Sequence, residues 1–490
     1  MIDFRTCYLY LIIVFVALFA VFPLTDTDIW WHLACARKWV TTWTPVRDPV
    51  VNVHEYFQQV VAFVYDVGGT PLLVAFKAVL WSLVFALFLR GVKCRNLTSS
   101  AIAVVVLFIF RYQFEIRPVL FSLLFLGIYW NVLPWLFRTR NEMGGLCAKR
   151  VAKPYNVVKT AGAAVLILAI QWLWCKFQGL YILGPIFAMI VVALQWWNSR
   201  GSGHQMARNL LLWRVAFVTL LFAMPLLHRN GLNLFLYPFG LLDRLLGLSP
   251  SAAVFASEIA ENRSPITLLK AGENVLQSAL MVVFSVVGIV LAVRRLRHAE
   301  TVWLLVTAVL ALVAERNFVL FLPVLFAVVL KTRPALKVSL STVYPMFAVV
   351  LVAFVLGLWL RSISQYDSMV AYQRVPVAAT QWMLENPHSG RLFNDDRAGG
   401  YLAFMNPSDS TFIDGRFILK TAEFFEKYLR YAESPQTFLH DADSLDIDRV
   451  VLPLRYYARW DKLLETLDSS EKWHVAYRDS LFAVMDRTEH

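Results

Sequence analysis

The sequence predicts a polytopic α-helical membrane protein that ends in a smaller α/β domain outside the membrane. Apolar residues make up 58% of the 490 residues and charged residues only 16%, whereas a soluble globule is nearer half apolar and a quarter charged. Long apolar runs recur up to residue 360, and beyond that point the charge changes sign. Residues 361–490 carry 15 Lys and Arg against 20 Asp and Glu, although the whole chain has a net charge of +12.

We therefore divide the chain into a transmembrane domain, 1–360, and a C-terminal domain, 361–490. The membrane part holds a net charge of +17, so the basic balance belongs to membrane loops and predicts no nucleic-acid partner. The five cysteines form no CxxC pair and all precede residue 176. Neither a disulfide framework nor a zinc site is predicted.

About 11 transmembrane helices are expected, because a span needs roughly 20 apolar residues, or fewer where protein shields its ends. The run at 60–89 is long enough to begin with a surface segment, and 302–314 with 317–330 predicts a helical hairpin. Turn dipeptides in 228–273 predict a lateral or re-entrant segment. The first apolar run, 8–24, is preceded by a single Arg and followed by no signal-peptide cleavage site. We therefore interpret it as a retained transmembrane helix and not as a cleaved signal peptide. The predicted runs are 8–24, 60–89, 99–111, 119–137, 160–175, 180–198, 211–227, 274–293, 302–314, 317–330 and 340–360.

Basic residues set the predicted orientation. They cluster at Arg90–Arg95, in 138–159, at Arg200–Arg214, at Arg294–Arg297 and at Lys331–Lys337, and each cluster follows an even-numbered helix. The positive-inside rule makes these loops cytoplasmic. The N-terminus is then cytoplasmic, and the eleventh helix delivers the acidic C-terminal domain to the extracytoplasmic side.

The predicted outer side gathers ionisable residues of both signs, as a binding cleft does. Charges near hydrocarbon depth cost about 2.5–3.5 kcal/mol each, so they persist where they pair or line a cavity. The first outer loop, 25–58, is the richest of these segments. Candidate site residues are Asp26, Asp28, His32, His54, Glu55, Arg117, Lys176, Glu258 and Arg316.

Asp26 and Asp28 form the sharpest local pattern. Two carboxylates two residues apart can face one cleft, where one holds a divalent metal such as Mg or Mn and the other accepts a proton. The competing interpretation is a helix cap beside an interfacial aromatic pair, Trp30 and Trp31. The pattern permits a metal without requiring one.

Each other candidate has a structural alternative. Arg117 either anchors at the interface or grips a phosphate, which suits Arg geometry. Arg316 either caps a hairpin or supplies a second phosphate ligand, and Lys176 either snorkels or binds. The remaining four candidates also have structural interpretations. His32 fits an interface histidine, His54 and Glu55 fit loop surface, and Glu258 with Glu261 fits a solvated helix face.

The C-terminal domain alternates helix-like and strand-like segments, which predicts a small α/β fold. Strand-like runs are 391–394, 410–413 and 447–454, followed by a hairpin of 473–478 and 481–485; helices are expected at 374–386, 418–432, 435–442 and 457–468. Asp414 and Arg416 follow one of these runs, where open sheets place ligand groups. A turn with a local ion pair is the alternative. We expect a domain that recognises an acceptor or acts as a lid.

Short motifs spread in order over residues 25–416 make the chain resemble the GT-C glycosyltransferases, and more closely a group of bacterial GT-C-like membrane proteins. The matching pieces are Asp26-Thr-Asp28-Ile-Trp-Trp-His32-Leu, Arg47-Asp48-Pro49, His54-Glu55-Tyr-Phe, Ile116-Arg117-Pro118, Glu315-Arg316-Asn317-Phe, Gly399-Gly400-Tyr-Leu and Ile413-Asp414-Gly415-Arg416. One stretch departs from the expected Trp-x-Asn-x-His-Gly, because Lys176 and Gln178 stand in place of Asn and His.

The resemblance implies an integral enzyme of the bacterial inner membrane. It would transfer a sugar from a polyprenyl-phosphate carrier to a glycan, lipid or protein acceptor, inverting the anomeric centre, with Asp28 or Asp26 as base and membrane lipid around it. Arg117 and Arg316 would neutralise the carrier phosphate. The alternative functions are a lipid or solute transporter and a non-catalytic scaffold in cell-envelope assembly.

The predicted orientation is tested with topology reporters. A reporter fused after residue 360 should report an extracytoplasmic location, and a reporter fused at residue 145 should report a cytoplasmic one. The reason is that Lys and Arg cluster in every second loop. Alkaline phosphatase and fluorescent-protein fusions at both positions measure this. A cytoplasmic tail would place Asp26 and Asp28 on the opposite side of the membrane.

Overall fold

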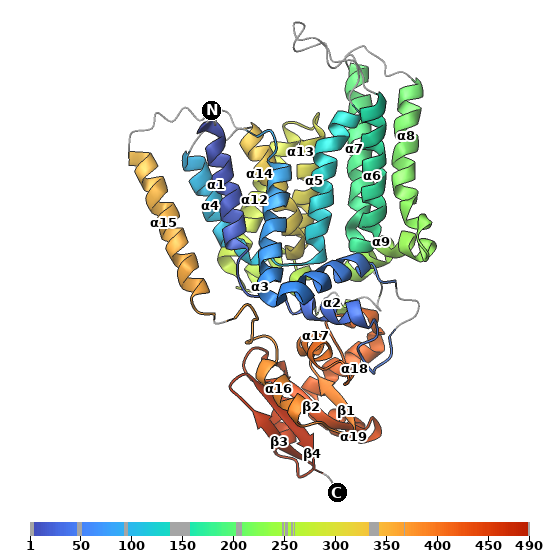
Figure 1. Cartoon of the computed structure of the whole chain (residues 1–490), viewed down its shortest axis with the longest axis vertical. Helices are drawn as coiled ribbons and strands as arrows, with labels where there is room; N and C mark the ends of the chain where they lie inside the picture. Colours follow the sequence, from blue (N-terminus) through green and yellow to red (C-terminus); the bar gives the residue numbers. More distant parts are fainter. Residues whose placement is uncertain are drawn as a thin grey trace.

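The computed structural model describes residues 4–46, 51–92, 97–137, 157–201, 208–246, 249, 253–255, 258, 260–332, 343–366 and 368–488. Helices form a bundle, and a smaller domain with a sheet lies beyond one end of it (Figure 1). We call this end of the bundle the domain-facing end. The Arg47–Asp48–Pro49 motif, most of the basic segment 138–159, and Lys93, Arg95, Arg333 and Lys337 lie outside the described residues.

The bundle is built of apolar helices that run side by side (Figure 1). Within the described ranges, seven helical segments are long and apolar enough to cross a membrane, in α3, α5, α6, α7, α8, α12 and α15; α1, α4 and α13 are apolar but shorter. The predicted count of about 11 spans stays a prediction. The bounds are α1 Phe4–Phe19, α3 Glu55–Phe88, α4 Leu97–Ile109, α5 Pro118–Leu136, α6 Val157–Phe177, α7 Leu183–Gly201, α8 Arg208–Ala223, α12 Val275–Val293, α13 Ala299–Val313, α14 Phe318–Thr332 and α15 Val343–Ile363.

Helix α3 begins with a surface segment, as expected from the length of its apolar run. Gly68 and Gly69 leave helical geometry, with Gly69 at φ 63°, and Pro71 follows. A left-handed φ suits Gly because it has no Cβ. The first part of α3 therefore lies across the domain-facing end before the second part enters the bundle (Figure 1), and it exposes Phe63 and Val67.

The segment predicted to be lateral also lies at the domain-facing end. It follows η4 Met224–Leu227 and contains α9 Gly231–Leu246, η5 Ala260–Asn262 and α11 Pro265–Lys270. Helix α9 exposes Leu232 and Phe239. The hairpin prediction is confirmed too, since α13 and α14 pack together across the short turn η6 Glu315–Asn317.

The C-terminal domain carries a four-stranded sheet in the order β1-β2-β4-β3, with β1 parallel to β2 and the other pairs antiparallel. Strand β2 lies inside the sheet, and all its residues except Asp448 are buried. The elements are α16 Val377–Glu385, β1 Arg391–Asn394, α17 Asp396–Met405, η7 Phe417–Leu419, α18 Ala422–Glu433, α19 Pro435–Ser444, β2 Ile447–Pro453, η8 Ala458–Trp460, α20 Asp461–Asp468, β3 Trp473–Arg478 and β4 Phe482–Arg487. The predicted α/β character and terminal hairpin are confirmed.

One local prediction in this domain was wrong, and one helix was not predicted. Residues 410–413 form no strand; Thr411 makes only an isolated bridge to Thr42 of the first loop. Residues 396–405, which contain Gly399 and Gly400, form α17 although two glycines disfavour a helix by about 1 kcal/mol each. Tertiary packing explains both cases, because each segment is held by the loop that follows α1.

Helix α17 packs against α2 Asp28–Arg37, which begins that loop's contact with the C-terminal domain. The ring of Trp30 meets Tyr401 edge to face at 4.8 Å. A Cβ on Gly400 would lie 2.8 Å from the Trp31 backbone nitrogen, so only Gly permits this close approach. The Gly399–Gly400 pair therefore serves helix packing.

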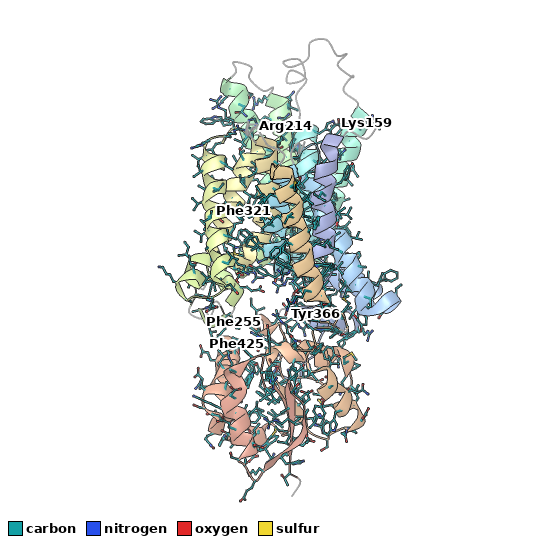
Figure 2. All side chains as sticks on the ribbon, turned by 90° about the vertical axis from the view of Figure 1, so that its left-hand side faces the viewer. Lys159, Arg214, Phe255, Phe321, Tyr366 and Phe425 are labelled. Carbon is teal, nitrogen blue, oxygen red and sulfur yellow. The ribbon has the colours of Figure 1, made fainter. Side chains whose placement is uncertain are left out.

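A second contact comes from the lateral segment. Phe255 stacks on Phe425 of α18 with ring centroids 5.2 Å apart, and it belongs to the C-terminal domain's own core. Figure 2 shows these two rings at the junction between bundle and domain. Both α2 and the lateral segment thus fasten the domain to the bundle.

An imidazole between two carboxylates connects three segments of the C-terminal domain. His388 Nδ1 lies 2.6 Å from Asp448 and Nε2 lies 2.9 Å from Asp409. Burial alone would lower the pKa of His388, but hydrogen bonds and charge from both carboxylates raise it to about 9. A raised folded-state pKa stabilises the fold fully below the unfolded value of about 6.5, and this is lost as pH rises through 9.

We predict that His388→Gln lowers the free energy of unfolding of the C-terminal domain at pH 6 by up to about 2 kcal/mol, since solvent screens part of the interaction, and that the unfolding midpoint falls with it. The deficit should shrink as the pH rises from 7 to 10, because wild type loses the imidazolium there. Thermal unfolding of the full chain at several pH values measures it. His440→Gln is the matched control, since that side chain is 86% exposed beside Asp441; an equal effect in both variants would refute the assignment.

Candidate active site

Asp26 and Asp28 flank the start of α2 at the domain-facing end. Asp26 is buried, and its Oδ1 accepts the backbone N–H of Asp28 at 3.2 Å. Asp28 is the first residue of α2 and is half-buried. Asp26 therefore binds the first N–H of α2, although the N-cap position itself is Thr27 and its side chain makes no cap hydrogen bond. The second oxygen of Asp26 points elsewhere.

That second oxygen belongs to an ion-pair network centred on Arg117. Arg117 precedes Pro118 at the start of α5, and its Nε donates to Asp26 Oδ2 at 2.5 Å. Its Nη1 and Nη2 donate to the two oxygens of Glu261, each at 2.7 Å. Burial would raise the pKa of Glu261, but the Arg117 guanidinium lowers it to about 2. Arg117 thus binds two carboxylates rather than standing free for a phosphate.

Arg316 lies beside this network and is more available. Its side chain is exposed and Nη1 donates to Asn262 Oδ1 at 3.0 Å. Its positive charge helps to lower the pKa of Glu261, and it also interacts electrostatically with Asp28. Arg374, at the entry to the C-terminal domain, donates to the Thr25 carbonyl at 3.0 Å and also acts on Glu261. Two further cations therefore approach the carboxylates from different segments.

The electrostatic setting of Asp28 differs from that of Asp26. Desolvation, followed by the charge of Asp26, raises the pKa of Asp28 to about 8, while Arg117 opposes the rise. From the domain side, a Cβ on Gly415 would clash with Asp28 Oδ1 and lie 3.0 Å from the Trp31 ring. Asp28 is therefore a weakly acidic carboxyl group covered by the C-terminal domain.

A buried pair lies behind Asp26, inside the bundle. Lys77 of α3 is fully buried, lies 3.9 Å from Glu115 and donates to the Phe22 carbonyl at 3.1 Å. Thr25 Oγ1 donates to Glu115. The chain next to Asp26 is thus fixed by a second ion pair.

The other candidates from the first loop form a neighbouring group. The rings of His32 and His54 lie 5.4 Å apart, and His54 Nδ1 lies 3.4 Å from the Phe177 carbonyl. Burial lowers the pKa of His54 to about 4, and it lowers the pKa of His32 well below its usual value. Lys176 pairs with Glu55 at 2.7 Å. These residues hold the first part of α3 against the end of α6, and both histidines are neutral.

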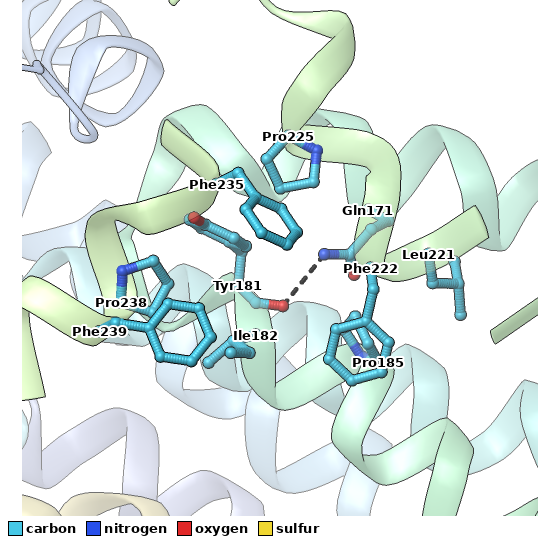
Figure 3. A pocket seen from close by; sticks show the side chains of 10 residues that line it. All are labelled: Gln171, Tyr181, Ile182, Pro185, Leu221, Phe222, Pro225, Phe235, Pro238 and Phe239. Atoms are coloured by element: carbon cyan, nitrogen blue, oxygen red, sulfur yellow. Dashed lines mark hydrogen bonds between the residues drawn. The ribbon is translucent and has the colours of Figure 1, made fainter. Parts of the chain in front are cut away.

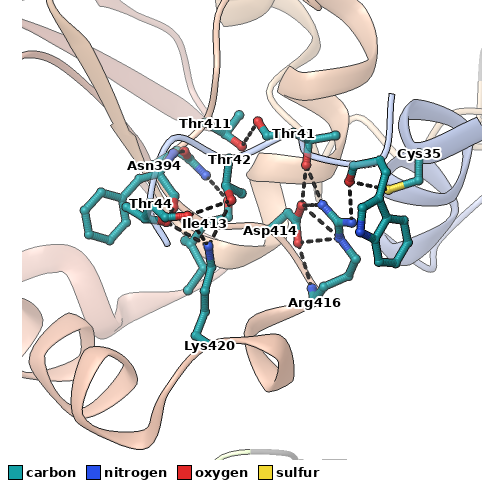
Figure 4. Close-up of polar contacts among 12 residues, drawn as sticks. Cys35, Thr41, Thr42, Thr44, Asn394, Thr411, Ile413, Asp414, Arg416 and Lys420 are labelled. Atoms are coloured by element: carbon teal, nitrogen blue, oxygen red, sulfur yellow. Dashed lines mark hydrogen bonds and ion pairs between the residues drawn. The ribbon is translucent and has the colours of Figure 1, made fainter. Parts of the chain in front are cut away.

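Asp414 and Arg416 pair with each other, and together they hold the first loop. Arg416 Nη2 lies 2.6 Å from Asp414 and also donates to Thr41 Oγ1 at 2.6 Å, while Nη1 reaches the Trp39 carbonyl. Lys420 Nζ donates to three oxygens of Thr42 and Thr44, each at 2.9 Å (Figure 4). The local ion pair that was the alternative interpretation is present, and it clamps the loop that carries Asp28.

Glu258 and Glu261 bind different partners. Glu258 pairs with Arg459 of the C-terminal domain, whereas Glu261 binds Arg117. Glu258 is helical and Glu261 lies in η5, and neither is the unpaired charge that a solvated face would present. Glu258 therefore joins the contacts that fasten the domain.

Two hollows lie away from this cluster. One, of about 30 Å³, is apolar and lies between α6, α7, α8 and α9, where Gln171 Nε2 donates to the Tyr181 carbonyl at 3.0 Å (Figure 3). That volume suffices for about one water. The other, of about 200 Å³, is lined by Asn198, Arg297, Glu300, Lys331 and neighbouring residues. Neither contains a residue of the carboxylate cluster.

Sequence reasoning missed several members of the cluster. Lys77 was passed over inside the apolar run 60–89, although one charge in such a run signals a buried partner. Glu261 was noted only beside Glu258, and Arg374 was not considered. Gly415 was noted only as part of a turn, and nothing local signals its contact with Asp28.

The sequence matches no protein-family model and no curated protein, but the fold is similar to solved structures. The apo form of the Archaeoglobus fulgidus oligosaccharyltransferase aligns with a TM-score of 0.57 at 13% identity, over 91% of this chain and 70% of that chain. Archaeal oligosaccharyltransferase AglB from Archaeoglobus fulgidus, in complex with an inhibitory peptide and a dolichol-phosphate, aligns with a TM-score of 0.53 at 13% identity, over 92% and 70%. The likeness shows that this chain shares the overall fold of these structures.

A third structure is the Archaeoglobus fulgidus oligosaccharyltransferase in complex with Zn and sulfate, with a TM-score of 0.53 at 13% identity, over 90% of this chain and 68% of that chain. We therefore asked whether the cluster here fits a divalent ion. Asp26 and Glu261 already accept hydrogen bonds on both of their oxygens. Among the described residues, no group of three or more His, Cys, Asp or Glu could hold a metal. The residues present do not fit one.

We predict that Gly415→Ala loosens the contact between the C-terminal domain and α2. The added methyl must displace Asp28 or Trp31, and overpacking of this kind costs about 1–3 kcal/mol. The midpoint of thermal unfolding of the full chain should fall. Gly357→Ala in α15 is the control, because nothing lies within 4 Å of its added Cβ, and it should leave the midpoint unchanged or raise it. Equal midpoints for both variants would contradict the close contact.

Proposed function

We propose that this protein is a membrane glycosyltransferase that moves a sugar from a polyprenyl-phosphate carrier to an extracytoplasmic acceptor, with inversion. The single observation that carries the proposal is Asp28: a covered carboxyl group with a pKa of about 8, beside guanidinium groups, where bundle and C-terminal domain meet. The fold adds support, since a likeness to AglB in complex with a dolichol-phosphate is consistent with a lipid-linked donor.

The proposed reaction is a direct displacement. Asp28 removes the proton of the acceptor hydroxyl, whose oxygen bonds to the anomeric carbon as the bond from that carbon to the carrier phosphate breaks. A base functions best when its pKa is near the working pH, and desolvation gives Asp28 this property. Asp26 supports it by keeping the pKa of Asp28 raised.

The leaving phosphate needs positive charge more than it needs a proton. Arg316 is exposed, donates a hydrogen bond to Asn262 and interacts electrostatically with Asp28. It is the proposed phosphate ligand, with Arg374 as a second cation from the C-terminal domain. Arg117 contributes indirectly, because its donors hold Asp26 and Glu261.

The C-terminal domain is the proposed acceptor side of the site. Its loop of Asp414, Gly415 and Arg416 covers Asp28, and Arg416 lies over the Trp31 ring at 5.6 Å. An acceptor must then approach between this loop and the bundle. This arrangement fits the predicted orientation, with the domain outside a bacterial inner membrane and the carrier in the outer leaflet.

We predict that Asp28→Asn leaves a folded protein that still binds the carrier lipid but transfers sugar at least about a hundredfold more slowly, because loss of a general base costs about 10²–10⁴ in rate. Release of polyprenyl phosphate from a labelled polyprenyl-phosphate sugar measures turnover. Asp26→Asn should reduce the rate less.

Asp66→Asn is the matched control, since Asp66 is an exposed carboxylate of α3 that pairs with Arg37. It should turn over like wild type. Near-normal transfer by the double variant Asp26→Asn/Asp28→Asn would refute this mechanism. Release of no polyprenyl phosphate by wild type, with labelled lipid instead crossing the bilayer, would favour a transporter.

A further inference from the structure

Arg117 is the central charge of the cluster. It uses three nitrogens on two carboxylates from segments far apart in the sequence: Nε on Asp26 after α1, and Nη1 with Nη2 on Glu261 in η5. The contact to Glu261 is bidentate, the geometry that a guanidinium makes best with a carboxylate. One side chain therefore joins the first loop, α5 and the lateral segment.

The cluster needs a cation at this point. Asp26, Asp28 and Glu261 are close enough for the charges of Asp26 and Glu261 both to raise the pKa of Asp28. Three carboxylates gathered this closely repel one another unless a cation lies between them. In many proteins that cation is a hard divalent ion, which prefers carboxylate oxygens.

We propose that Arg117 is the resident cation of this cluster and occupies the place of a divalent ion, so that the wild-type cluster binds no Mg²⁺ or Mn²⁺. The reason is that the carboxylate oxygens of Asp26 and Glu261 already have hydrogen-bond donors. Arg117 and the N–H of Asp28 occupy both oxygens of Asp26, and Arg117 occupies both of Glu261. Each oxygen keeps a second lone pair, but a divalent ion that used it would lie beside the guanidinium, and the two positive charges would repel each other.

The inference also explains why the cluster departs from a metal-binding constellation. A metal-holding pair of carboxylates would direct free oxygens towards a common point, whereas here the free carboxyl group is Asp28, covered by Gly415. The binding claim is independent of the proposed function. Only its consequence for catalysis, that transfer needs no added metal, rests on that function.

The test is a Mn²⁺ titration of the full chain in lipid nanodiscs, with free Mn²⁺ followed by electron paramagnetic resonance and stability by thermal shift. Wild type should show no saturable site and no shift of the unfolding midpoint. Arg117→Gln removes the cation and keeps a side chain of similar length. It should gain one saturable site, and Asp26→Asn added to it should abolish that site.

Arg263→Gln is the matched control, because Arg263 also binds one glutamate through two nitrogens, Glu273 at 2.9 and 2.6 Å. Removing it should create no Mn²⁺ site. A saturable site in wild type that Asp26→Asn abolishes would overturn the proposal, and this result does not depend on the folding of Arg117→Gln. So would a folded Arg117→Gln that binds no Mn²⁺.

A transfer assay with and without EDTA separates this inference from the proposed function. Transfer at an unchanged rate in EDTA supports the inference, and transfer abolished by EDTA but restored by Mn²⁺ overturns it. If wild type transfers no sugar under any condition, the proposed function fails, while the titration still decides where the cation of the cluster comes from.

Discussion

Charge compensation at the junction of bundle and C-terminal domain is the constraint on which the rest of the structure depends. Asp26, Glu115, Asp414 and Lys77 are all buried there, and each has a partner of opposite charge: Arg117, Lys77, Arg416 and Glu115. Breaking one buried pair costs about 3–5 kcal/mol, because the remaining charge is left without compensation. The partners come from α3, α5 and both sides of the junction, so the pairs fix how these parts meet.

The same constraint separates the roles of the carboxylates. Asp26 and Glu261 are committed to Arg117 and behave as fixed charges, whereas Asp28 makes no ion pair with any of the described residues. Desolvation therefore raises the pKa of Asp28. A chemically useful group arises because Arg117 is committed to its two neighbours.

Much of the fold could be predicted from the sequence, but the pairing within the site could not. Apolar runs located the helices, and the strands β1 and β2 follow from short apolar runs bounded by turn residues. Asp26, Asp28, Arg117 and Arg316 stood out because each charge lies at the end of an apolar run. The link from Arg117 to Glu261 spans 144 residues, and no local pattern specifies it. Helix α17 was missed because its Gly-Gly pair suits packing against Trp31 rather than helix propensity.

The break in α3 at Gly68 and Gly69 has a consequence for the depth of the site in the bilayer. The first part of α3 exposes Phe63 and Val67, and amphipathic segments of this kind settle at the headgroup boundary. Phe57, in that same part, packs edge to face on His32 of α2 at 4.7 Å, four residues from Asp28. Thicker or thinner membranes change the tilt of spanning helices, but the carboxylates keep their height relative to the nearer headgroups. Under the proposed function, a lipid-borne phosphate, which stays at that level, would therefore meet Asp28 at the same depth in either membrane.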